Sequence, residues 1–105
     1  MTFVRCEITR WVDDEPQPGI VECALVDRSG KRWLFIEKDA IVAAAFINAK
    51  STYPQPGEID CTVIRHGADA DGDFVEIDTQ KPWGIESVDG VTRFLVTPEQ
   101  VVISD

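Results

Sequence analysis

Apolar and polar residues alternate along most of this chain, and a period of two predicts strands that bury one face. Within residues 3–12, for example, Val4, Cys6 and Ile8 share one face while charged residues occupy the other. The segment 20–26 is apolar on both faces over most of its length, which is typical of a central strand. The predicted strands are 3–12, 20–26, 31–37, 59–63, 75–77, 85–88 and 91–96.

Two short turns predict hairpins. Asp27–Gly30 favours a tight turn in which Gly30 takes a positive φ angle. Asp89-Gly90 is the strongest hairpin signal in the chain, and it predicts that 85–88 pairs with 91–96.

Two further connections are predicted from their composition. The polar stretch His66–Asp73 predicts a long exposed loop inside a hairpin that runs from Ile59 to Ile77. Thr97–Gln100 resembles a capping box with proline at the first helical position, so we expect one helical turn before Val101–Ile103.

Ala40–Ala49 is the segment that favours a helix. It contains five alanines and neither glycine nor proline, and Asp39 precedes it as a candidate N-cap. A helix here would carry one apolar stripe formed by Ile41, Val42, Ala45, Phe46 and Ala49. The β-branched residues leave an extended conformation open as the alternative.

These elements predict a mainly β fold. A chain of 105 residues is the size of one domain, so we expect residues 1–105 to form a single unit. A sheet rich in hairpins exposes its edges unless it curls. We therefore expect a single small antiparallel barrel, closed or partly open and OB-like or SH3-like, with one short helix. The exact topology and the oligomeric state stay open.

The charge of the chain excludes some partners. Ten Lys and Arg face 19 Asp and Glu, which gives a net charge of −9. Such a surface repels phosphate backbones, so we expect no nucleic-acid binding. The acidity either keeps the protein in solution or attracts a basic protein. A basic group at Arg28, Lys31 and Arg32 flanks a predicted turn, where solvation accounts for it.

The apolar segments are too short for a membrane. The longest, 40–47, is well below the ~20 residues that a spanning helix needs. Charged residues interrupt the first 12 positions, so we expect no signal peptide, no membrane association and a cytoplasmic location.

The three cysteines are an odd number and lie far apart in the sequence. Cys6, Cys23 and Cys61 each lie in an apolar strand-like run, so we expect buried free thiols. No pair of cysteines and histidines has the spacing of a zinc site.

We expect no enzyme, metal or cofactor, because the known nucleophile, metal and phosphate-binding motifs are missing from the sequence. His66 is the single histidine and has no partner motif nearby. Asp69, Asp71 and Asp73 begin like a calcium-binding loop, but Phe74 and Gln80 stand where that loop needs glycine and glutamate.

The tryptophans are the candidate binding residues. Trp83 lies between a proline and a glycine, where its ring can stay outside regular strand pairing. Glu86 and Asp89 follow it and could form an acidic rim, and Trp11 is a second candidate. The alternative is that Trp83 plugs one end of the barrel.

Two stretches resemble segments of small uncharacterised bacterial β-barrel proteins. They are Lys81–Gly90, with Phe94 and Val96 after it, and Tyr53–Gly57, followed by Ile59 and Cys61. The resemblance extends over most of the chain and implies no activity.

Two functions fit these observations. The first is a non-enzymatic acidic interaction protein that recognises a basic protein, for example an immunity-type inhibitor of a toxin. The second is a barrel domain that binds a small ligand or an oligonucleotide.

Overall fold

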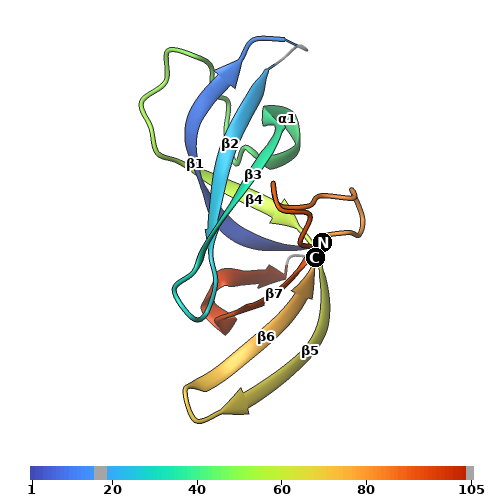
Figure 1. Cartoon of the computed structure of the whole chain (residues 1–105). Coiled ribbons are helices and arrows are strands. Elements are labelled where there is room, and N and C mark those ends of the chain that lie inside the picture. Colours follow the sequence, from blue (N-terminus) through green and yellow to red (C-terminus); the bar gives the residue numbers. More distant parts are fainter. Residues whose placement is uncertain (16–18, 104–105) are drawn as a thin grey trace.

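The computed structural model describes residues 1–15 and 19–103, which form two antiparallel sheets (Figure 1). The larger sheet has the strand order β3-β2-β1-β4, with β8 also paired to β1, and the smaller has the order β5-β6-β7. The elements are β1 (Thr2–Asp13), β2 (Ile20–Val26), β3 (Arg32–Lys38), α1 (Asp39–Val42), β4 (Gln55–Asp60), β5 (Thr62–Asp69), β6 (Gly72–Asp78), β7 (Arg93–Val96), η1 (Pro98–Gln100) and β8 (Val101–Ile103). The mainly β prediction is therefore confirmed.

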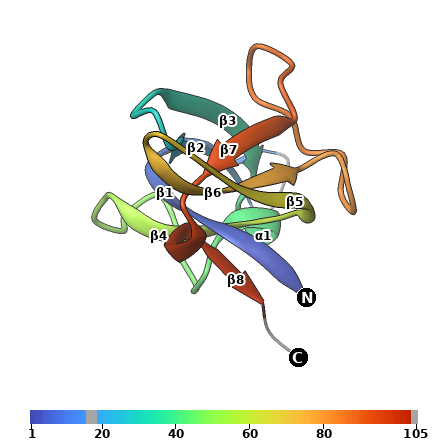
Figure 2. The same cartoon turned by 90° about the horizontal axis from the view of Figure 1, so that it is seen from below.

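Strand β1 organises the larger sheet. Its residues 3–8 pair with β4 on one side. On the other side, residues 2–4 pair with β8 and residues 7–13 pair with β2. Figure 2, seen from below, shows β8 alongside the beginning of β1. This long strand therefore holds together elements from both ends of the chain.

The two sheets do not close into a barrel, so the closed form of the expected barrel is wrong. Where the edges meet, single backbone hydrogen bonds replace a ladder: Arg28 donates to the Leu95 carbonyl at 2.8 Å and Val88 donates to the Leu34 carbonyl at 2.9 Å. The turn that carries Arg28 therefore lies against the edge of β7, and the loop that carries Val88 lies against the edge of β3. Strands would have to pair at those edges to close the barrel.

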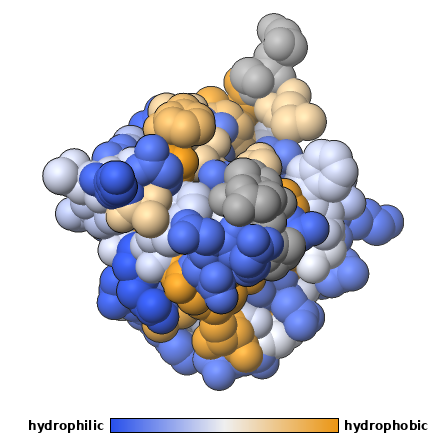
Figure 3. Space-filling view, turned by 90° about the horizontal axis from the view of Figure 1, so that it is seen from above, coloured by the Kyte–Doolittle hydropathy of each residue, from blue (hydrophilic) through white to orange (hydrophobic). Residues whose placement is uncertain are grey.

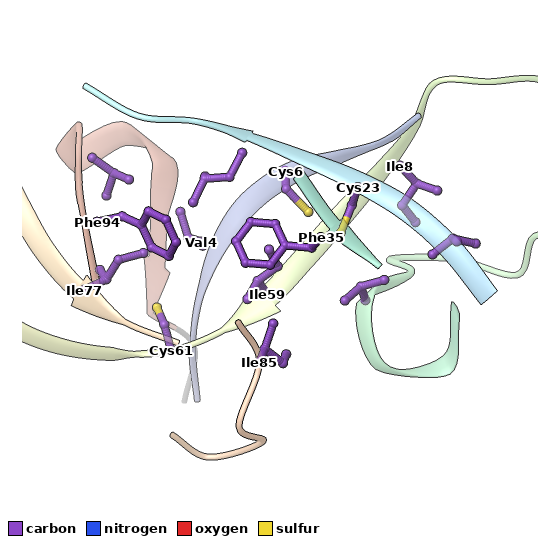
Figure 4. Close-up of a cluster of buried hydrophobic side chains, with 14 of the residues drawn as sticks. Val4, Cys6, Ile8, Cys23, Phe35, Ile59, Cys61, Ile77, Ile85 and Phe94 are labelled. Atoms are coloured by element: carbon purple, nitrogen blue, oxygen red, sulfur yellow. The ribbon is translucent and has the colours of Figure 1, made fainter. Parts of the chain in front are cut away.

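The core lies between the sheets and follows the predicted alternation (Figure 4). Val4, Cys6 and Ile8 of β1 point into it together with Phe35 of β3. From the smaller sheet, Phe94 packs its ring against Phe35 with the ring centroids 5.7 Å apart. Trp33 is partly buried and packs edge-on against Phe94, with the ring centroids 5.3 Å apart.

A short helix is present, but its predicted extent, Ala40–Ala49, is wrong: α1 ends at Val42. Ala43 takes an extended conformation and forms a bridge with Gly57 of β4, so a tertiary contact overrides the helix propensity of the alanines. Phe46 is 90% exposed instead of lying on a buried stripe. Asp39 does not act as the N-cap, because it is the first residue of the helix and Lys38 occupies the cap position.

The predicted long loop His66–Asp73 is also wrong, because β5 continues to Asp69 and β6 begins at Gly72. A glycine explains the longer hairpin. Gly67 pairs with Phe74, and the ring of Phe74 occupies the space above it; a Cβ on Gly67 would lie 2.3 Å from that ring. The polar composition of this stretch thus belongs to an exposed strand pair.

Two other strand predictions need correction. The run 59–63 is broken at Cys61, whose N–H donates to the Thr2 carbonyl, so its two halves belong to different sheets. The turn at Asp89-Gly90 forms, with a φ of 81° at Gly90, but 85–88 is not a strand. The capping box and the helical turn at Thr97–Gln100 are confirmed, and β8 follows them as a strand that was not predicted.

Within the described residues, no helix is both long and apolar enough to cross a membrane.

Candidate interaction surface

The loop 79–92 between β6 and β7 is held in place from within. Thr79 is fully buried, and its hydroxyl donates to the Ile85 carbonyl at 2.6 Å. Ile85 itself is buried in the core. Ser87 is buried as well, and its Oγ accepts the Val91 N–H at 3.0 Å. These contacts fix the backbone of the loop, so the side chains between them point outwards in a defined arrangement.

Trp83 is the large exposed side chain of this loop. Its ring is 58% exposed, and its Nε1–H donates to Asp60 Oδ2 at 2.6 Å. Gly84, next to it, has a φ of 67° and donates its N–H to the Gln80 carbonyl. A ring with this exposure is not a buried plug, and the hydrogen bond to the end of β4 restricts its orientation.

Acidic and apolar side chains share the loop with Trp83. Glu86 and Asp89 are exposed, and Val88 is 59% exposed. Glu37 of β3 lies close enough to Glu86 for the two carboxylates to interact electrostatically. Burial, and then the charge of Glu86, raise the pKa of Glu37 above the usual range of a glutamate. We call Trp83, Val88, Glu86, Asp89 and Glu37 the Trp83 surface.

Trp11 is placed differently from Trp83. It lies near the end of β1, is partly buried, and donates its Nε1–H to Asp14 Oδ1 at 2.8 Å. Its ring covers Gly19 so closely that a Cβ there would lie 2.0 Å from it. No ring contact or hydrogen bond joins Trp11 to Trp83 among residues 1–15 and 19–103. The structure therefore does not bring the two candidate tryptophans together.

The basic group near the first hairpin is mostly engaged. Arg28 pairs with the Asp69 carboxylate and also donates to the Gly72 carbonyl. Lys31 lies over the ring of Trp33, with Nζ 4.0 Å from the ring centroid. Arg32 forms no ion pair or ring contact with any described residue. His66 is an exposed residue of β5.

A groove of about 610 Å³ on the outer face of the larger sheet had no signal in the sequence. Its floor is formed by outward-facing residues of β1 and β2, including Arg5 and Val26. Ala44 and Pro54 lie beyond β4, and Gln100 from η1 lies beside Val26, to whose carbonyl it donates at 2.8 Å. Residues from four strands and two connections meet here, so no local motif could have predicted the groove.

The three cysteines are free and buried, as predicted. The neighbouring Cys23 thiol, together with burial, raises the pKa of Cys6 well above its usual range. Burial, and then the charge of Asp60, raise the pKa of Cys61 to about 11. Thiolates are the reactive form, so Cys6 and Cys61 are poor nucleophiles at neutral pH.

We expect the native protein at pH 8 to react with much less than one equivalent of a thiol reagent. At that pH about one Cys61 in a thousand is a thiolate, because its pKa lies roughly three units higher. Denaturation should expose three reactive groups. Fast labelling of the native protein, or fewer than three groups after non-reducing denaturation, would contradict the assignment.

Comparison of the chain with protein-family models, curated proteins and solved structures gives no match.

Proposed function

We propose that the chain is a non-enzymatic interaction protein that recognises a basic protein partner through the Trp83 surface. The observation that carries the proposal is the exposed side chain of Trp83, oriented by Asp60, on a loop that also exposes Glu86 and has its backbone fixed by buried residues. Aromatic anchors with a polar rim are typical of protein interfaces.

The charge of the Trp83 surface favours a cationic partner. A lysine or arginine can lie on the exposed face of an indole ring while carboxylates nearby balance its charge. A cation beside Glu37 and Glu86 also relieves the repulsion that contributes to the raised pKa of Glu37. Binding should then lower this pKa and release a proton, so the affinity should fall as the pH is lowered through the acidic range. An immunity-type inhibitor of a basic toxin is one protein of this kind.

Two broader inferences accompany this function. We infer a cytoplasmic location, because three buried free thiols suit a reducing compartment. We also infer an OB-like or SH3-like relationship for the partly open β fold, because three strands, a helix and further strands follow one another as in an OB-fold. Such a relationship by itself assigns no activity.

Trp83→Ala is expected to weaken partner binding by more than tenfold, since anchors of this kind contribute roughly 2 kcal/mol or more. The immobilised protein would first capture its partner from the native lysate, and the affinity of the purified pair would then be measured. The free energy of unfolding should fall by less than about 1 kcal/mol, because the ring is largely exposed and its hydrogen bond lies at the surface.

Phe46→Ala is the matched control, because it removes another exposed aromatic ring from a different loop. It should leave partner affinity unchanged, whereas neutralising Glu86 and Asp89 should weaken binding and reduce its dependence on salt. An acidic partner, or one that binds the Trp83→Ala protein as tightly as the native chain, would refute the proposal. Unfolding of Trp83→Ala would show that the ring serves the core.

A further inference from the structure

The groove on the outer face of the larger sheet has the size and lining of a ligand site. Its volume of about 610 Å³ lies within the roughly 300–1,000 Å³ of small-molecule pockets. Phe3, Ala24, Val26 and Pro56 supply apolar surface along its length. Along β1, the exposed Arg5 and Glu7 of the groove alternate with the buried Val4, Cys6 and Ile8 of the core.

The arginines of the chain divide into two groups. Four of the six form ion pairs: Arg10 with Glu22, Arg28 with Asp69, Arg65 with Glu76 and Arg93 with Asp78. Arg5 and Arg32 form no ion pair or hydrogen bond through their side chains with any residue in 1–15 and 19–103. Both line the groove. Among the described residues, the two guanidinium groups without a carboxylate at ion-pair distance thus line the same groove.

These two arginines lie around the end of β2. Arg32 of β3 is the cross-strand partner of Val26 on β2, and Arg5 lies on the neighbouring strand β1. Gln100 is the other polar group at this end of the groove. Guanidinium groups bind carboxylates through two parallel hydrogen bonds, and such charge-assisted bonds are stronger than neutral ones.

We propose that this groove binds an organic anion in which one carboxylate is attached to an apolar chain. The carboxylate lies between Arg5 and Arg32, and the apolar chain lies along Ala24 and Pro56. The site is separate from the Trp83 surface and is independent of the protein partner proposed there.

Two acids also line the groove and set the strength of this binding. Glu58 of β4 is the cross-strand partner of Arg5, and Glu7 lies two residues further along β1. They reduce the positive potential that an incoming carboxylate meets, and Glu58 is the nearer to Arg5 in the sheet register. Removal of the Glu58 charge should therefore tighten the binding of an anion, whereas removal of the Arg5 charge should weaken it.

The test is an NMR titration of the ¹⁵N-labelled protein with decanoate. We expect saturable shifts of the backbone amides of Arg5, Val26 and Arg32, with no change at Trp83. Acetate lacks the apolar chain and decylammonium carries the opposite charge, so both should bind at least about tenfold more weakly. Shifts that appear mainly in β5–β7, or decylammonium binding as tight as decanoate binding, would overturn the proposal.

Charge variants separate this site from general surface binding. Arg5→Gln combined with Arg32→Gln should weaken decanoate binding roughly tenfold, and Glu58→Gln should strengthen it about twofold. Arg10→Gln is the matched control, because Arg10 is an exposed arginine of the same sheet that is paired with Glu22. Equal losses in Arg10→Gln and in Arg5→Gln alone, which remove the same charge, would show that only the net charge matters, which would refute the site. Circular dichroism of each variant checks that the sheet is intact.

Discussion

Phe35→Ala is expected to lower the free energy of unfolding by about 3–5 kcal/mol, as is typical of a buried phenylalanine. The side chain is fully buried between the sheets and packs against the ring of Phe94. Its removal opens a cavity where the two sheets meet, and strands on both sides cannot collapse into it without losing their register. Urea unfolding followed by tryptophan fluorescence measures the change.

Ile36→Ala is the control for this prediction. Ile36 follows Phe35 on β3, faces the other side of the sheet and is 41% exposed, so its truncation should cost about 1 kcal/mol or less. Natural domains unfold with roughly 5–15 kcal/mol, so the Phe35 variant should be visibly less stable than its neighbour. Equal losses at the two positions would mean that the face of β3 assigned to the core is wrong.

The strands could be predicted because their signal is local. In β1, burial alternates residue by residue from Val4 to Ile8, and this pattern is visible in the sequence without knowledge of any partner. The partners themselves could not be predicted. In the sequence, Cys61 continues the alternation of apolar and polar residues. In the structure, its N–H donates to the Thr2 carbonyl, and the chain passes there from the larger sheet to the smaller. Nothing in the apolar period marks that break.

The predicted length of the helix was wrong for a related reason. Alanine propensity is worth a few tenths of a kcal/mol per residue, whereas the pairing of Ala43 with Gly57 and the burial of Ile47 involve distant parts of the chain. Tertiary contacts of this kind readily override such weak preferences. The outcome is an exposed Phe46 where a helical stripe would have buried it.

The candidate sites, too, could be predicted from the sequence only in part. The exposure of Trp83 could be inferred from the residues beside it, because Pro82 and Gly84 disfavour regular pairing. The hydrogen bond to Asp60 could not, because it joins positions 23 residues apart. The groove that Arg5 and Arg32 line was invisible for the same reason, since each arginine alone resembles any exposed strand residue.

Ile85→Ala is expected to lower the free energy of unfolding by about 2–5 kcal/mol and to loosen the loop that carries Trp83. Ile85 is almost completely buried in the core although it lies outside any strand. Its carbonyl accepts the Thr79 hydroxyl and its N–H donates to the Thr79 carbonyl, so the loss of packing also disturbs this pair of hydrogen bonds. Urea unfolding measures the stability, and amide hydrogen exchange measures the opening of the loop.

Val88→Ala tests whether the loss of stability is specific to the buried Ile85 or follows from any truncation in the loop. Val88 lies in the same loop but is 59% exposed, so its truncation should change the free energy of unfolding by about 0.5 kcal/mol or less. The Ile85 variant should also bind the basic partner more weakly than the Val88 variant does, because a mobile loop must be ordered before Trp83 can dock. If Ile85→Ala left both the free energy of unfolding and the amide exchange of residues 79–92 unchanged, the loop would not depend on the burial of Ile85. The argument that buried residues fix the orientation of the Trp83 surface would then be wrong.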